Sequence, residues 1–379
     1  MTTTGQGMPR GAGAGQLTQA KASARGRWRI QARMQPSAAW RSVSILAALL
    51  GAFVLSALLI ASAHVNVGTA LGVMVQGAFG SRGAVIETLV QATPFILTGL
   101  AVTVAFRGRI FNIGAEGQFF AGAMAAYWLA TVLRGAPQAV MLPAVLLAGC
   151  AGGALWGFIP GVLKARYGAS EIIVTVMLNF VIALVLSFLL ANPWREPTSY
   201  FYQTALMPDA SYLPRLVSGG RLHLGFPLAL VVAALVWVLL WKTTLGYEIR
   251  AMGINSLAAR YKGISVATTT ILVLVISGAI AGLAGVGELT GIHHRLRLDI
   301  SVGYGFAGII IALLGQLHPV GVVLAAIFLG ALLNGASAMQ IVTGVPVALV
   351  NAIQGITLLC LLIADVLARY EIRRTAGND

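Results

Sequence analysis

The residues of this chain that could do chemistry are polar side chains set singly among apolar ones. Asn179, Glu288, Asn334, Asn351 and Gln354 all have this setting. In an apolar medium, such a group either hydrogen-bonds to a neighbouring helix or lines a water-filled path. We take Asn179, Glu288 and Asn334 as candidate residues of such a path. An interhelical hydrogen bond is the alternative for each of them.

No set of residues has the spacing of a catalytic or metal site. The sequence contains no Gly-Lys dipeptide, which excludes an ATP-binding P-loop, and it has no HExxH or GxSxG motif. Cys150 and Cys360 lie in apolar stretches, and the neighbours His293 and His294 lack further evident ligands. We therefore predict no catalytic residue, no metal site and no cofactor bound by this chain.

One polar segment, residues 242–264, has the pattern of a short capped helix. Asn255 is a suitable N-cap and Gly263 a suitable C-terminal stop. Leu257 and Tyr261 are four residues apart and share a face, with Ala258 beside them and Arg260 on another face. Such a helix could insert its apolar tip into a groove on a partner. An ordinary surface loop is the alternative.

A second polar segment, residues 106–126, follows a basic pair, Arg107 and Arg109. Asn112 could cap the helix that follows, and Glu116 would lie in its first turn, where the helix dipole favours an anion. We expect Glu116 to be a structural carboxylate at shallow depth. A polar contact that changes during gating is the alternative.

The composition indicates that lipid surrounds the elements that position these residues. Of 379 residues, 58% are hydrophobic and only 9% are charged, too few charges to cover a water-soluble surface. The net charge of +14 could suggest nucleic-acid binding. Most Lys and Arg residues, however, fall in segments on one predicted side of the membrane. We therefore interpret the positive charge as a signal of membrane topology and predict no nucleic-acid partner.

The predicted fold class is all-α, a polytopic membrane bundle of about ten transmembrane segments. Runs of roughly 20 apolar residues cross a bilayer. The predicted spans are 43–63, 83–106, 114–133, 138–163, 172–191, 225–241, 265–287, 303–316, 319–335 and 346–364. Segment 303–316 is short for a full crossing, so a re-entrant segment and nine spans are the alternative. Basic residues after Ala364 favour ten.

Both termini are then predicted to be cytoplasmic. Residues 1–42 form a basic tail that we expect to be disordered, 43–368 form the membrane domain, and 369–379 form a second tail. The basic region before the first span is too long for a signal peptide. The loop 192–224 is predicted to lie outside. Its aromatic residues suit either a membrane interface or a docking surface.

Glycines in the fourth predicted span recur every four residues, at Gly149, Gly153, Gly157 and Gly161, and Gly278 and Gly282 repeat the spacing in the seventh. Small residues at this spacing let helices approach closely. The stripe predicts packing and does not specify a substrate path.

Several segments resemble the nucleoside-type permeases of bacterial ABC importers, in the branched-chain amino acid and ribose permease superfamily. They are ATPFILTGLAVTVAFRGRIFNIGAEGQFFAGA (92–123), EIIVTVMLNFV (171–181), GYEIRAMGINSLAARYKGI (246–264) and GYGFAGIIIALLGQLHPVGVVLAAIFLGALLNGA. The resemblance covers roughly residues 80–370. The long basic tail departs from the usual members.

The resemblance implies a plasma-membrane permease of the type II importer arrangement that moves nucleosides or a related small polar solute. Its partners would be a cytosolic ATPase that uses ATP and Mg²⁺, a second permease chain in a homo- or heterodimer, and an extracytoplasmic substrate-binding protein. Segment 246–264 would be the coupling helix that docks on the ATPase. Asn112, Glu116 and Gln118 would be the polar residues of the family motif.

Three other functions remain open at this point. A permease for simple sugars or branched-chain amino acids in the same superfamily would carry similar segments. An ion-coupled secondary transporter would need charges deep in its spans, whereas residues 300–364 contain no Asp, Glu, Lys or Arg. A membrane enzyme or assembly factor would need a convergent catalytic set, and none is evident.

Overall fold

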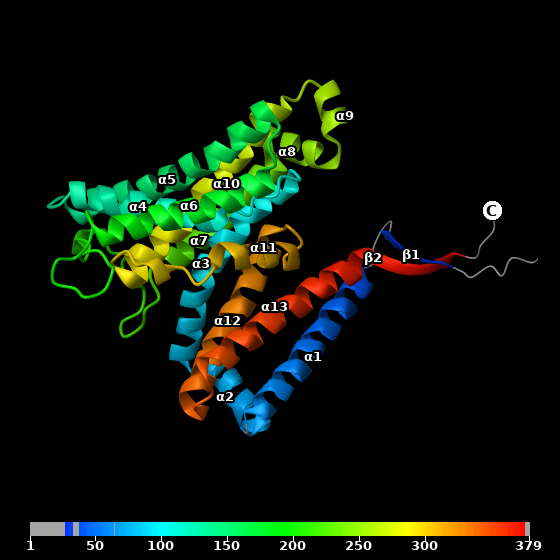
Figure 1. The fold of residues 1–379 in the computed structure, drawn as a ribbon, viewed down its shortest axis with the longest axis horizontal. Coiled ribbons are helices and arrows are strands. Elements are labelled where there is room, and N and C mark those ends of the chain that lie inside the picture. Colours follow the sequence, from blue (N-terminus) through cyan, green and yellow to red (C-terminus); the bar gives the residue numbers. More distant parts are fainter. Residues whose placement is uncertain (1–26, 33–37, 64, 376–379) are drawn as a thin grey trace, which may run out of the picture.

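The computed structural model describes residues 27–32, 38–63 and 65–375, and these are predominantly helical (Figure 1). The principal elements, with their bounds, are β1 (Arg27–Ala32), α1 (Ala38–Ser62), α2 (Val67–Phe79), α3 (Arg82–Arg107), α4 (Ala115–Val132), α5 (Gln138–Tyr167), α6 (Glu171–Ala191), α7 (Gly225–Lys242), α8 (Thr244–Ile254), α9 (Ser256–Tyr261), α10 (Val266–Glu288), α11 (Tyr304–Leu314), α12 (Pro319–Thr343), α13 (Val347–Arg369) and β2 (Tyr370–Thr375). Short helical turns η1 (Asp209–Ser211), η2 (Leu289–His293) and η3 (Leu298–Ile300) complete the described elements.

Among the described residues, six helices are long and apolar enough to cross a membrane, or seven if a bent pair counts as one span. They are α3, α5, α6, α7, α10 extended through η2, and α12, with the bent pair formed by α1 and α2. The coarse prediction of a polytopic helical bundle is confirmed. The count of ten spans and the side of each terminus remain predictions.

The short predicted span 303–316 is the 11-residue helix α11. At 1.5 Å per residue it extends about 16 Å, roughly half the ~30 Å of a hydrocarbon core. It begins after Gly303, whose φ is 89°, and ends at a tight turn in which Gln316 and Leu317 also have positive φ. The segment is therefore shorter than a full crossing by itself, in keeping with the alternative of a broken or re-entrant segment.

Helix α2 is absent from the sequence prediction, which has a loop after the first span. The chain turns by 120° between α1 and α2, and Asn66 caps α2 by accepting a hydrogen bond from the Thr69 N–H at 3.1 Å. Gly77 of α2 lies directly against Ala338 of α12. The sequence signal was an isolated 13-residue apolar stretch, too short to predict as a span.

The glycine stripe packs α5 against α10, as the sequence predicts. A Cβ atom added at Gly153 would lie 2.1 Å from the Gly278 carbonyl oxygen, and one at Gly282 would lie 2.3 Å from the Gly149 carbonyl oxygen. The two backbones are therefore in direct contact, and no larger side chain fits between them without displacing the helices.

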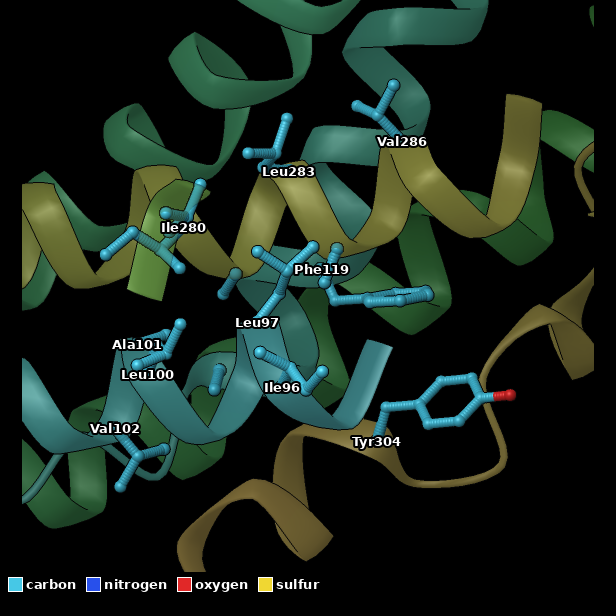
Figure 2. Packing of buried hydrophobic residues seen from close by; sticks show 14 of the residues in the cluster. Ile96, Leu97, Leu100, Ala101, Val102, Phe119, Ile280, Leu283, Val286 and Tyr304 are labelled. Atoms are coloured by element: carbon cyan, nitrogen blue, oxygen red, sulfur yellow. The ribbon is translucent and has the colours of Figure 1, made fainter. Parts of the chain in front are cut away.

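The buried apolar side chains form two separate clusters. The main cluster centres on α3, α4 and α10, and Figure 2 shows Leu97 and Leu100 of α3 close to Phe119 of α4 and Leu283 of α10. The second cluster joins Ile60 of α1, Ala70 of α2, and residues of α12 and α13 such as Met339 and Ile353. The described residues thus form two hydrophobic cores.

Strands β1 and β2 form a small antiparallel pair, hydrogen-bonded from Arg27–Thr375 to Ala32–Tyr370. The predicted tails 1–42 and 369–379 fall partly outside the described residues. Where they are described, they contribute these strands and the first turn of α1. The pair lies toward the same side of the molecule as α9, on the right of Figure 1.

Candidate functional site

A polar cavity of about 360 Å³ lies where α3, α10, α12 and α13 approach one another. This volume is within the roughly 300–1,000 Å³ of small-molecule sites. The polar residues that line it come from widely separated elements: Glu87, Gln91, Arg221, Glu288, His293, Asp299, Tyr304, Ser337, Gln340, Asn351 and Gln354. Val90, Ile292, Ile300, Val302, Leu333 and Val350 supply the apolar part of the wall. The cavity can therefore hold a small solute with both polar and apolar surfaces.

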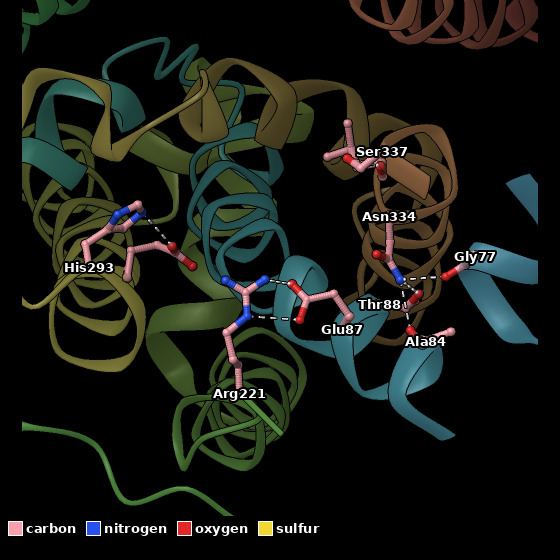
Figure 3. A network of polar contacts seen from close by, with 10 residues as sticks. Gly77, Ala84, Glu87, Thr88, Arg221, His293, Asn334 and Ser337 are labelled. Atoms are coloured by element: carbon pink, nitrogen blue, oxygen red, sulfur yellow. Dashed lines mark hydrogen bonds and ion pairs between the residues drawn. The ribbon is translucent and has the colours of Figure 1, made fainter. Parts of the chain in front are cut away.

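An ion pair between Glu87 and Arg221 lies in the cavity wall (Figure 3). The Arg221 Nε donates to Glu87 Oε2 at 3.2 Å, and its Nη2 donates to the other carboxylate oxygen. Glu87 lies in the second turn of α3, and Arg221 lies in the loop before α7. The pair therefore joins that loop to the helix bundle beside the cavity.

Glu288 ends α10, and its side chain is only 5% exposed. Its Oε2 lies 3.7 Å from the Nε2 of His293, which η2 presents on the next turn (Figure 3). This distance is longer than an N–H···O hydrogen bond. Of the three predicted path residues, only Glu288 is among the residues that line this cavity. Asn351 and Gln354, which have the same setting in the sequence, also line it.

Asn334 and Asn179 lie elsewhere and act as structural links. The Asn334 amide donates to the carbonyl oxygens of Gly77 and Ala84 and lies 3.1 Å from the Thr88 hydroxyl, which ties α12 to α2 and α3 (Figure 3). Asn179 accepts from the Gly117 N–H at 2.8 Å and donates to the Ile113 carbonyl at 2.9 Å. Each side chain makes the interhelical hydrogen bonds that were the alternative to a path role.

The family-motif residues form a buried junction beside the cavity. Asn112 donates to Gln118 Oε1 at 2.9 Å and to Ser277 Oγ at 2.8 Å, halfway along α10. The connection after α3 thus folds back into the bundle before α4 begins, and Glu116 is buried there. Its depth in the membrane remains a prediction. Asn112 does not cap α4 directly: α4 starts at Ala115 after Gly114, whose N–H donates to Asn112 Oδ1.

Glu116 joins the starts of two helices. It lies in the first turn of α4, and its Oε2 accepts from the Gly305 N–H, in the first turn of α11, at 2.7 Å. The Ser301 side chain lies close to this carboxylate. The partial positive charges of two helix N-termini favour an anion at this place. The arrangement suits the structural reading of Glu116.

The predicted capped helix corresponds to α9, which Asn255 caps by accepting from the N–H groups of Leu257 and Ala258. Leu257 and Tyr261 are 59% and 85% exposed. Ala258 and Arg260 are also exposed, and Gly263 follows the helix with a φ of 83°. The sequence reading missed α8, which Thr243 caps before it. Together α8 and α9 form a projecting helical elbow (Figure 1).

The loop 192–224 lies against the segment that follows η2. Glu196 pairs with Arg295 at 3.1 Å, Tyr212 stacks on His294 with ring centroids 3.8 Å apart, and His223 is buried. Burial, together with the nearby His294, lowers the pKa of His223 to about 4. His223 is therefore neutral at physiological pH. The contacts above, which are packing and polar contacts, hold the loop that carries Arg221 in place.

The sequence reading missed most of the cavity wall. Gln91 and Gln340 are polar residues within apolar helices, which was an available signal. No signal paired Glu87 with Arg221, because 134 residues separate them and the contact depends on the folded loop. Within the described ranges, no group of three or more His, Cys, Asp or Glu residues could hold a metal ion.

Comparison with known proteins identifies several relatives. Residues 84–362 match the family model described as branched-chain amino acid transport system permease component. The chain is 38% identical to the guanosine ABC transporter permease protein of Bacillus subtilis, over 89% of this chain and 95% of that protein. It is 39% identical to the glucose ABC transporter permease protein of Haloferax volcanii, over 82% and 85%.

A third similar protein is the nucleoside ABC transporter permease protein of Lactococcus lactis, 36% identical over 69% of this chain and 74% of that protein. No solved structure matches the chain significantly.

Proposed function

Because the chain belongs to the family of branched-chain amino acid transport system permease components, we propose that its cavity carries nucleosides across the plasma membrane. The chain is the membrane-spanning permease subunit of an ABC importer, a multi-pass membrane protein. A permease subunit of this kind is not itself an enzyme. The observation that carries the choice of solute is the cavity of about 360 Å³, with both polar and apolar walls.

A nucleoside has a flat apolar face on its base and hydrogen-bonding groups on both base and ribose. The side-chain amides of Gln91, Gln340, Asn351 and Gln354 and the carboxyl group of Glu288 suit the polar groups. Tyr304, Ile300 and Val302 give the wall an aromatic and aliphatic side for the base. The cavity therefore offers both hydrogen-bonding and apolar surface to a solute of this kind.

The energy for transport comes from a separate cytosolic ATPase that binds ATP and Mg²⁺. The elbow of α8 and α9 lies on the cytoplasmic face in this proposal, with both chain termini on the same side and about ten membrane segments in all. Leu257, Ala258 and Tyr261 insert into a groove of the ATPase, and Asn255 and Gly263 fix the ends of α9. Arg260 is exposed on another face of α9.

The complete transporter contains two permease chains and an extracytoplasmic binding protein that delivers the solute. The loop 192–224 is the natural place for that delivery, because it lies on the cavity side of the bundle and holds Arg221 in the wall. Tyr200 and Phe201, which are 97% and 76% exposed, supply an aromatic surface there.

A simple sugar is the second candidate solute. The glucose permease of Haloferax volcanii is as similar to this chain as the guanosine permease is. A hexose would fill less of the cavity but would use the same hydrogen-bonding groups. Competition between nucleosides and glucose for uptake distinguishes the two solutes.

The test reconstitutes this chain in proteoliposomes with its ATPase, its permease partner and its binding protein. We expect ATP-dependent uptake of radiolabelled guanosine that excess unlabelled adenosine or uridine reduces and glucose does not. Uptake of glucose alone would replace the nucleoside proposal with the sugar one. Uptake that proceeds without ATP but collapses with the proton gradient would overturn the ABC mechanism.

A further inference from the structure

We propose that Glu288 contacts the transported solute, and that its carboxyl group binds a pair of adjacent hydrogen-bond donors on a neutral nucleoside. This inference rests on the proposed function, and it assigns a substrate-binding residue to the permease chain itself. Selection of the solute would then continue inside the membrane after delivery by the binding protein.

The first observation is that the Glu288 side chain is buried without hydrogen bonds. It is 5% exposed and lines the cavity, and the one ion-pair contact that it makes among the described residues, to His293 Nε2, is 3.7 Å long. Burying a carboxyl group without hydrogen bonds is unfavourable by several kcal/mol. A bound solute that donates two hydrogen bonds would remove this unfavourable state.

The second observation is a set of open amide groups on the opposing walls. Gln91 comes from α3, Gln340 from α12, and Asn351 and Gln354 from α13. Within the described part of the chain, none of these four side chains hydrogen-bonds to another protein group. Each therefore has free donors and acceptors where the cavity can present them to a solute.

The charges of the wall favour a neutral solute over a phosphorylated one. Arg221 is held by Glu87, and Asp299 of the wall pairs with Arg297 at 2.5 Å. No arginine or lysine of the described wall is left to pair with a phosphate group, whereas Glu87, Glu288 and Asp299 are carboxylic acids. An unpaired anion in such a site would be strongly destabilised.

Two parts of a guanosine molecule offer adjacent donors to a carboxyl group. The ribose presents its 2′- and 3′-hydroxyls, and the guanine edge presents N1–H and the 2-amino group. Both can form two parallel hydrogen bonds to carboxylate oxygens. The uptake of guanosine analogues distinguishes these two donor pairs.

The experiment measures uptake kinetics in proteoliposomes that contain the whole transporter, with Glu288→Gln in this chain. We expect a KM for guanosine raised about tenfold, which corresponds to about 1.4 kcal/mol of lost binding. Complex assembly, measured by co-purification of the ATPase, stays at the wild-type level. The matched control is Glu171→Gln, since Glu171 also lies in a membrane helix but pairs with Lys164 away from the cavity.

The substrate series identifies the donor pair. If the ribose is bound, 2′,3′-dideoxyguanosine has an equally raised KM with wild type and variant, while inosine behaves like guanosine. If the base is bound, the variant raises the KM for dideoxyguanosine as it does for guanosine. The KM for inosine, which lacks the 2-amino group, then differs little between wild type and variant. GMP, up to millimolar concentration, should not compete with guanosine in wild type.

An unchanged KM for guanosine in an active Glu288→Gln transporter would overturn the proposal. Should this variant not assemble, Glu288→Asp retracts the carboxyl group by one methylene. It must then raise KM in the same way, and an unchanged value has the same negative meaning. A wild-type transporter that carries glucose and no nucleoside would contradict the proposed function separately, and the same variants would then be tested on glucose.

Discussion

Glu116 holds the start of α11 against the start of α4, so its removal should lower the stability of the folded protein. Glu116→Ala leaves the buried N–H of Gly305 without an acceptor. An unsatisfied buried donor is destabilising by about 1–3 kcal/mol. We expect a lower melting temperature of the purified protein in a tryptophan-fluorescence unfolding experiment.

The matched control for this position is Glu116→Gln, which keeps an oxygen acceptor of the same length. It should retain most of the wild-type melting temperature. Equal losses in both variants would mean that the charge between the two helix N-termini, and not the hydrogen bond, holds the junction.

The burial of His223 predicts that loop 192–224 is sensitive to acid. Burial lowers its pKa from an unfolded value of 6.5 to about 4, so the folded state resists protonation. Its contribution is fully present above pH 6.5 and is lost as the pH falls from 6.5 toward 4, up to about 3 kcal/mol. His294 is the titratable group beside it and contributes in the same direction.

The measurement is the melting temperature of the protein at several pH values between 7 and 4. His223→Phe should flatten the profile in this window relative to wild type. His318→Gln, in the turn between α11 and α12, should leave the profile unchanged. A wild-type slope that survives in His223→Phe would assign the effect to other groups.

At the scale of elements, the contact between α5 and α10 tolerates no side chain. A Cβ at Gly282 would lie 2.3 Å from the Gly149 carbonyl oxygen, whereas one at Gly287 of the same helix would meet nothing within 4 Å. Gly282→Ala should therefore destabilise the protein by about 1–3 kcal/mol through overpacking. Gly287→Ala should be neutral or slightly stabilising in the same unfolding assay.

The exposed face of α9 predicts the docking site of the ATPase. Leu257→Asp combined with Tyr261→Asp places two charges on that face and should abolish co-purification with the ATPase and ATP-dependent uptake. Ser256→Asp adds a charge at the N-terminus of the same helix, where it favours helix formation, and should preserve both. Normal uptake by the double variant would refute the docking role.

The elements themselves were largely predictable, and the cavity was not. Length and composition locate α3, α5, α6 and α10, because a helix that crosses a bilayer must be a long apolar run. Helix α8 and helix α2 were missed because they are short and lie beside stronger signals. The pairing of Glu87 with Arg221 depends on how the 33-residue segment 192–224 folds over the bundle. The local sequence does not predict this tertiary arrangement.

At the scale of the molecule, the proposed orientation places α9 inside the cell and the loop 192–224 outside. Single cysteines at Tyr261 and Tyr200, both highly exposed, can report this in intact cells. We expect a membrane-impermeant maleimide to label Tyr200→Cys directly and Tyr261→Cys only after the membrane is opened. The two native cysteines are buried or half-buried, and wild type serves as the background. The reverse labelling pattern would invert the topology.

The two hydrophobic cores have a mechanical consequence. Val350 belongs to the second core and also lines the cavity, whose opposite wall is built on the first core through Ile300 and Tyr304. Two bodies that are each well packed can tilt against one another while keeping their own interior contacts. Such a tilt would widen or narrow the cavity between the two cores. A cross-link between α3 and α13 would fix the width of the cavity without unfolding either core.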